Sequence, residues 1–221
     1  MKNSVTKFLN TFRNILDQNK KFLTYSLGIE FQKQAILDLE RLQKRTVKIK
    51  NKMIVKKDEE SSNILLSLES LLGCCINELR MLVFLKNDQM RKAWESLVLA
   101  QHCLRTAFQA NDIILKFDGN TYLKKLALLE KLFFPPQTFT SIGAVFEKSE
   151  CSICNKEYGS CNHVKGRPYM GSICYEKMTK LKEMLGLSIV DDPGSKMNRV
   201  IAVCEDDGWR DLLTWRIAKK V

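Results

Sequence analysis

The amino-acid sequence predicts a mainly α-helical protein, in which an N-terminal antiparallel helical bundle is followed by a small α+β unit. Apolar residues recur three and four positions apart through the first 135 residues, which is the period of an amphipathic helix. Beyond Pro135 and Pro136, which a helix cannot continue through, turn residues and short apolar runs replace that period. The predicted domains are the helical bundle at residues 1–135, a linker at 136–150 and the α+β unit at 151–221.

Each predicted helix is indicated by a stripe of apolar residues, with turn or capping residues at its ends. The acidic residues at 58–60 favour a helix start, because carboxylates stabilise the positive end of the helix dipole. Asn87 and Asp88 form a short turn, so the long helices on either side should pack as an antiparallel hairpin. The first predicted helix contains residues 8–16, and the second runs from residue 29 into a basic stretch. Three more are predicted at 62–86, at 88–115 and from 122 to about 133.

The C-terminal part predicts shorter elements. Residues 179–187, TKLKEMLGL, have the spacing of a short helix, and residues 209–217 have that of a C-terminal helix. Two strands are predicted at 187–190 and 198–204, joined by a turn rich in Asp, Pro, Gly and Ser. Trp209 and Trp215 either belong to the core of this unit or form an exposed patch for a partner.

Four strong metal ligands occur within thirteen residues, in the segment CSICNKEYGSCNH. A C-x2-C turn can direct two thiolates at one point, and two residues in an extended stretch, two positions apart, share a face. Gly159 offers a place for the chain to reverse between the two pairs. Because the surrounding residues are polar, burial of small cysteines in a core does not explain the cluster. The predicted ligands of a Zn²⁺ ion are Cys151, Cys154, Cys161 and His163.

The sequence leaves the role of Cys174 open, whereas Cys74 and Cys75 have one interpretation. Cys174 follows the cluster by eleven residues and either replaces one of the four ligands or packs beneath them. The adjacent Cys74 and Cys75 lie in the middle of a predicted helix, where they are interpreted as core residues.

The pattern C-x2-C-x6-C-x-H-x2-G-x2-Y-x-G-x2-C, from Cys151 to Cys174, resembles a short zinc-binding module of poorly characterised bacterial and phage proteins. The resemblance covers about fifty residues and does not extend to the helical part. It implies that the first three cysteines and the histidine are the ligands, and that Gly166, Tyr169 and Gly171 shape the loop. It also implies a binding and folding role without a reaction.

Positive charge is concentrated near the start of this chain, whose formal net charge is +11. Eight basic residues occur between positions 41 and 57 without an acid. Such a run can neutralise the phosphates of a nucleic acid, and it can equally be the solvated face of a helix. No aromatic residue is interleaved, which favours backbone contact over base stacking. The predicted nucleic-acid contacts are Arg41, Lys44, Arg45, Lys48, Lys50 and Lys52.

The function that these features predict is that of a non-enzymatic zinc-binding interaction protein, a component of an assembly that contacts nucleic acid through its basic segment. Four protein ligands close a zinc coordination sphere, so no catalytic residue is predicted. The alternative is a metal-dependent nuclease of the His-Asn-His type that uses His163. His102, the other histidine, is interpreted as a partly buried helical residue.

Composition and hydropathy bear on the cellular location and on association with other chains. No run approaches eighteen apolar residues, so no membrane span is expected, and the N-terminus lacks a secretory signal core. Eight cysteines without such a signal indicate reduced thiols and a cytoplasmic location. The apolar faces of the helices at 62–86 and 88–115 are expected to exceed what one bundle buries, which predicts a protein partner or a homo-oligomer.

Overall fold

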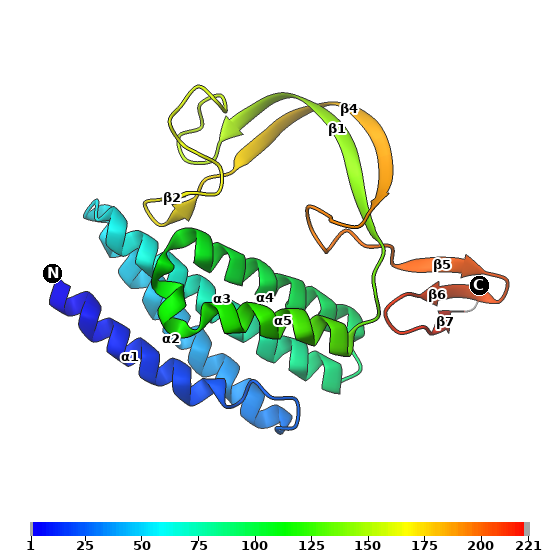
Figure 1. The fold of residues 1–221 in the computed structure, drawn as a ribbon, viewed down its shortest axis with the longest axis horizontal. Coiled ribbons are helices and arrows are strands. Elements are labelled where there is room, and N and C mark those ends of the chain that lie inside the picture. Colours follow the sequence, from blue (N-terminus) through cyan, green and yellow to red (C-terminus); the bar gives the residue numbers. More distant parts are fainter. Residues whose placement is uncertain (1, 219–221) are drawn as a thin grey trace. The chain divides into compact units, whose positions relative to one another are not determined.

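The computed structural model describes residues 2–218 and is mainly α-helical, with small antiparallel sheets (Figure 1). Two compact units divide the chain: a helical unit, residues up to 126 with 162–175, and a strand unit, residues 127–161 with those from 176 on. The helices are α1 Lys2–Lys20, α2 Ile29–Val55, α3 Glu59–Lys86, α4 Met90–Ala110, the 3-10 helix η1 Asp112–Phe117 and α5 Gly119–Phe133. The strands are β1 Phe139–Cys151, β2 Pro168–Tyr169, β3 Ser172–Ile173, β4 Glu176–Val190, β5 Ala202–Glu205, β6 Gly208–Asp211 and β7 Ile217–Ala218.

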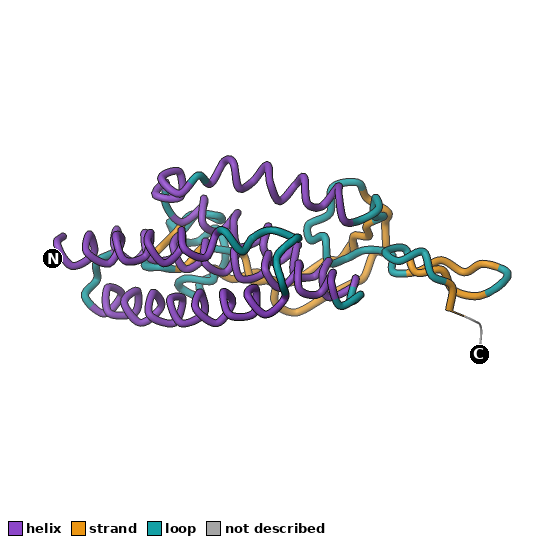
Figure 2. The backbone as a smooth tube through the Cα atoms, turned by 90° about the horizontal axis from the view of Figure 1, so that it is seen from below, coloured by secondary structure: helices purple, strands orange, loops and turns teal. Residues whose placement is uncertain are grey.

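Helix α3 is the central element of the helical unit. It packs against α2 on one side and α4 on another (Figure 1). Figure 2 shows the helices, in purple, lying lengthwise beside one another. Its start agrees with the capping prediction, because the Asp58 side chain accepts a hydrogen bond from the Ser61 backbone N–H at 3.1 Å. Leu65, Leu72 and Leu79 are fully buried. Since α3 is buried on most of its circumference, it has neighbours on several sides.

The helix predicted at 88–115 is shorter than expected. Helix α4 ends at Ala110 because Asn111 has an extended backbone, and the Asn111 side chain accepts a hydrogen bond from the Ile113 N–H at 2.9 Å to start η1. Cys74 and Cys75 are completely buried, as predicted. The apolar faces of α3 and α4 are largely covered inside the helical unit, so the expectation that these faces exceed it was wrong.

The strand unit contains a long two-stranded ribbon in which β1 pairs with β4 in antiparallel register. Most of the segment predicted as a linker, 136–150, forms β1. The helix predicted at 179–187 was wrong, because these residues lie in β4. Register shifts opposite Gly143 and Val145 insert extra residues into β4, which spaces its apolar residues in a way that imitates a helix.

The second sheet of the strand unit is the three-stranded β5-β6-β7. The predicted C-terminal helix was wrong here: the Asp211 carboxylate accepts hydrogen bonds from the backbone N–H groups of Leu213 and Thr214, both at 2.9 Å, and so forms a turn between β6 and β7. Trp209 and Trp215 expose 51% and 59% of their surface, which favours the exposed-patch interpretation over the core. Across residues 2–218, no helix combines the length and apolar character that crossing a lipid bilayer requires.

Candidate metal centre

Cys151 and Cys154 are brought together by a tight turn at the end of β1. The Asn155 N–H donates to the Cys151 carbonyl at 2.8 Å, and the Cys151 N–H donates to the Lys156 carbonyl at 2.8 Å. Asn155 has a positive φ of 55°, a conformation that asparagine tolerates better than most residues. The Ile153 N–H also points at the Cys151 sulfur, at 3.4 Å. The C-x2-C spacing therefore forms the thiol pair that the sequence predicts.

The second pair of ligands follows a chain reversal at Gly159, whose φ is +93°. The Ser160 N–H donates to the Glu157 carbonyl at 3.1 Å and closes this turn. His163 then lies edge-on to the Tyr169 ring, with ring centroids 4.6 Å apart and planes at 86°. The Tyr169 hydroxyl accepts a hydrogen bond from the Val164 N–H at 2.9 Å, so the phenol holds both the imidazole and the backbone that follows it.

The four predicted ligands form one cluster. Three thiols and one imidazole nitrogen, from Cys151, Cys154, Cys161 and His163, all lie within 4.8 Å of one another. In a tetrahedral zinc site with Zn–S bonds of about 2.3 Å, two sulfurs lie roughly 3.8 Å apart. The cluster is therefore close to the size of a zinc site and compatible with a Cys3His centre.

One ring nitrogen of His163 lacks, among the described residues, the hydrogen bond that a buried polar atom ordinarily makes. His163 Nδ1 is buried, and it has no hydrogen-bond partner among the described residues. A buried polar atom without a partner costs about 1–3 kcal/mol, so such atoms usually mark a missing ion or water. Together with three neighbouring thiols, the His163 imidazole meets the chemical requirements of a metal ligand.

The local electrostatics favour a thiolate. Burial raises the pKa of the Cys151 thiol, but hydrogen bonds from the backbone N–H groups of Cys154 and Ile153, and contacts with the thiols of Cys154 and Cys161, outweigh it. They lower that pKa from the ordinary 9.0 to about 6. Because the thiolate is the form of cysteine that binds metal, the lowered pKa of Cys151 favours cation binding by the cluster.

Cys174 is buried but does not belong to the group of four. Its backbone has a separate role. The Cys174 carbonyl accepts from the Gly166 N–H at 2.8 Å, while its own N–H donates to the Arg167 carbonyl at 2.9 Å. These bonds close the loop that carries β2 and β3.

That loop is fixed to the helical unit by contacts that sequence reasoning missed. The Gly171 N–H donates to Asn63 Oδ1 at 2.8 Å, in a buried position. Gly171 has a φ of +74°, and a Cβ atom there would lie 3.2–3.3 Å from side-chain atoms of Lys50 and Ile54. Only a glycine meets both requirements without strain. The partner, Asn63, lies 108 positions away in α3, and no local pattern indicates the pairing.

The predicted nucleic-acid contacts lie along α2. Residues 41, 44, 45, 48 and 52 are all exposed, and because they are three or four positions apart they follow one stripe of the helix. Lys56, just after the helix, extends the stripe. Lys50 differs from the others, because its ammonium group lies 2.6 Å from the Glu69 carboxylate and is mostly buried. We call the exposed set the α2 basic stripe: Arg41, Lys44, Arg45, Lys48, Lys52 and Lys56.

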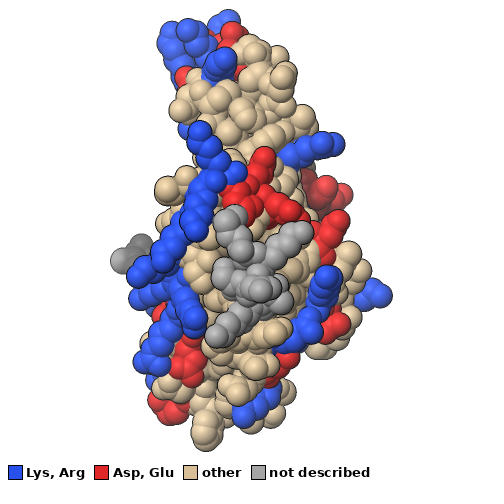
Figure 3. Space-filling model, turned by 90° about the vertical axis from the view of Figure 1, so that its left-hand side faces the viewer, with Lys and Arg blue, Asp and Glu red and all other residues tan. Residues whose placement is uncertain are grey.

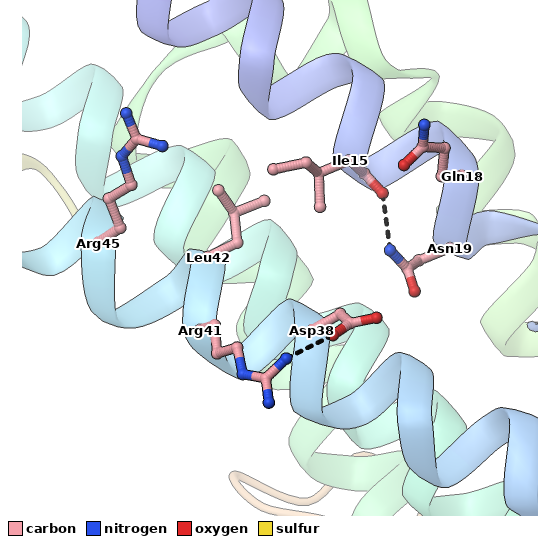
Figure 4. A pocket seen from close by; sticks show the side chains of 7 residues that line it. All are labelled: Ile15, Gln18, Asn19, Asp38, Arg41, Leu42 and Arg45. Carbon is pink, nitrogen blue, oxygen red and sulfur yellow. Dashed lines mark hydrogen bonds and ion pairs between the residues drawn. The ribbon is translucent and has the colours of Figure 1, made fainter.

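The stripe borders a pocket of about 340 Å³ between α1 and α2 (Figure 4). Ile15 and Leu42 approach one another across it, and Arg45 lies at one end. The Arg41 guanidinium is held at 3.0 Å by the Asp38 carboxylate, so part of the charge here is already compensated. On the face of the molecule drawn in Figure 3, lysine and arginine side chains form a band along one edge, and the main group of acidic side chains lies beside it.

His102 is exposed on α4, although the sequence analysis predicted a partly buried residue. It also lies outside the metal-ligand cluster.

Comparisons with protein-family models, with curated proteins and with solved structures gave no match. The resemblance to a bacterial and phage module therefore stays a prediction that rests on the residues between Cys151 and Cys174.

Proposed function

We propose that this chain is a zinc-binding, non-enzymatic interaction protein that contacts the phosphate backbone of a nucleic acid. The observation that carries the metal part is the cluster of three thiols and one imidazole nitrogen within 4.8 Å, with the buried Nδ1 of His163 lacking a hydrogen-bond partner among the described residues. Zn²⁺ is favoured because three thiolates and one imidazole are a usual ligand set for it.

A structural role for the ion follows from the number of ligands. Four protein ligands fill a tetrahedral coordination sphere, which leaves no position for water or substrate. Between residues 151 and 163, Cys151 is the one buried residue, so a hydrophobic core does not hold this segment in place. The ion would supply the stabilisation that apolar packing does not.

Metal content tests this part directly. The purified chain should contain about one zinc per molecule, and Cys154→Ser should lose most of it, because three ligands bind zinc far more weakly than four. Cys204→Ser is the matched control, since Cys204 is exposed in β5 and lies outside the cluster. Full zinc content in Cys154→Ser would overturn the assignment. So would zinc loss in Cys174→Ser with retention in Cys154→Ser.

The α2 basic stripe supports the nucleic-acid part. From residue 41 to residue 56 it extends over roughly 22 Å of helix axis, which matches about six base-pair steps of a duplex. The stripe presents charge without an exposed aromatic residue to stack on bases. Contacts of this kind would be made to phosphates and would be independent of base sequence.

Charge reversal separates the stripe from the general positive charge of the protein. Lys44→Glu, Lys48→Glu and Lys52→Glu together should weaken binding to a short DNA duplex by at least about 100-fold at low salt. They should also reduce the slope of log affinity against log salt by about three. The control combines Arg91→Glu, Arg105→Glu and Lys124→Glu, which are exposed residues off the stripe with the same change in net charge.

Equal weakening in both triple variants would show only a dependence on net charge and would contradict a specific surface. Undetectable binding of the unmodified chain at low salt would remove the nucleic-acid part and leave the metal part standing. Cleavage of the duplex with Mg²⁺ or Mn²⁺, abolished by His163→Ala, would favour the nuclease alternative.

A further inference from the structure

The β1–β4 ribbon has one apolar face that is largely exposed. Residues directly opposite one another in an antiparallel pair lie on the same face. The register places Ile142 opposite Leu187, Ala144 opposite Met184 and Phe146 opposite Leu181. We call this the ribbon face: Ile142, Ala144, Phe146, Leu181, Met184, Leu187 and Ile189.

Two bulges in β4 keep this face apolar from Ile142 to Phe146 of β1. The partner of Gly143 is Gly186 while that of Ala144 is Met184, so Leu185 is an extra residue in β4. Lys182 is extra in the same way, between the partners of Val145 and Phe146. Each bulge shifts the alternation by one residue and returns an apolar side chain to the ribbon face.

Between Ser141 and Val145, the opposite face of the ribbon is small and polar by comparison. It carries the pairs Ser141 with Ser188, Gly143 with Gly186, and Val145 with Glu183. The ribbon is therefore amphipathic, with one apolar and one polar face. This pattern is typical of an antiparallel sheet whose apolar face packs against another layer.

The ribbon face exposes more apolar surface than two strands alone can stably present to water. Leu187 and Ile189 expose 67% and 76% of their surface, and Met184 exposes 61%. Two strands alone are marginally stable in water and need a further layer against their hydrophobic side. Among the described residues, β1 and β4 pair over their length only with each other, apart from isolated bridges at Phe139 and Glu150, near the two ends of β1.

The area and chemistry of the face fit a second copy of this chain. Six large side chains, each exposing about two fifths to three quarters of roughly 180 Å², offer on the order of 600 Å² per copy, close to the roughly 800 Å² per partner of a standard interface. None of the seven residues is charged, so the face offers nothing that selects a charged partner. An identical face supplies the same length and the same aliphatic surface under two-fold symmetry.

We propose that two copies of this chain associate by packing their ribbon faces against one another in an isologous dimer. The contact forms a two-layer β-sandwich in which Ile142, Phe146 and Leu187 of each copy are buried. This inference is independent of metal and of nucleic acid.

Sedimentation equilibrium over a range of protein concentrations tests the dimer. The unmodified chain should show a mass approaching twice 25.5 kDa as concentration rises. The double variant Leu187→Lys with Ile189→Lys should raise the dissociation constant by at least about 100-fold, because it places two charges in the buried centre. Ser188→Lys is the control, since Ser188 lies between these two residues in sequence and on the opposite face of the ribbon.

A second measurement keeps the test valid if the ribbon loses its structure in the variants. Amide exchange at 142–146 and 181–189 in the unmodified chain should slow with rising concentration, because dimer formation protects the ribbon. A monomer at every concentration would overturn the proposal, whether its ribbon amides are unprotected or are protected by another part of the same chain. Equal weakening by Ser188→Lys would overturn it as well.

Discussion

Glu78 is the most unusual single residue in the helical unit. Its carboxylate is fully buried, yet it accepts a hydrogen bond from the Tyr122 hydroxyl and lies 2.5 Å from the Lys125 ammonium group. Burial raises the pKa of Glu78, and the Lys125 charge and the hydrogen bonds lower it by less, so the pKa lies above its ordinary 4.5. Tyr122 and Lys125 both belong to α5, so this group fixes the position of α5 on α3.

The raised pKa has a consequence for stability. A carboxyl whose folded-state pKa is raised stabilises the fold fully below its unfolded pKa, and the contribution is lost as pH rises through the folded value. We therefore expect the unfolding free energy of the unmodified chain, minus that of Glu78→Gln, to fall between pH 4.5 and pH 7.5. Urea titrations followed by helical circular dichroism at several pH values measure this difference. A difference that grows with pH would mean that attraction to Lys125 outweighs the cost of burial.

The residues of the candidate metal centre were predictable because they are local. Cys151 and His163 lie within one short segment, and the spacing alone limits how the four ligands can meet. Not all of the parts that support them were predictable in the same way. Tyr169, which the resemblance assigns to the loop, contacts His163 six residues away. Asn63 instead holds Gly171 from α3, 108 positions away, so this contact depends on how distant segments pack. The pairing of Lys50 with Glu69, which removes one basic residue from the predicted set, depends on the same packing.

At the scale of elements, the helices were predictable and β4 was not. The stripe of α3 reflects local periodicity, which a single sequence contains. In β4, Leu181, Met184 and Leu187 share one face at intervals of three, because each bulge adds a residue to the usual interval of two. That spacing matches a helix, and only pairing with β1, about forty residues away, distinguishes the two.

The same reasoning predicts where the helical unit is most sensitive. Leu72 in α3 is completely buried, whereas Leu99 in α4 exposes 44% of its surface. Leu72→Ala should lower the unfolding free energy by about 2–5 kcal/mol, since it leaves a cavity in a packed interior. Leu99→Ala makes the same chemical change at a half-exposed site and should cost less than about 1 kcal/mol. Denaturant titration of the two variants compares them, and equal losses would contradict the central position of α3.

At the scale of the whole molecule, the helical unit and the metal segment are stabilised in different ways. Helix α3 is surrounded by apolar side chains, whereas residues 151–163 include little that is buried. Much of the helical unit should therefore keep its structure without an ion, and the metal segment should not. The sequence composition already separates the two, because the apolar periodicity ends before the first ligand cysteine.

Removal of the metal should then have a local effect. After dialysis against a strong zinc chelator under reducing conditions, the helical circular dichroism should fall by less than roughly one tenth, while amide exchange at 151–166 accelerates by at least about 10-fold. Amides of α3 should stay protected, because Leu65 and Leu79 of this helix are fully buried and a packed apolar interior does not need the ion. Cys154→Ser without chelator should reproduce the same pattern, and chelator should change that variant no further. Cooperative loss of the α3 protection on chelation would show instead that the ion stabilises the entire fold.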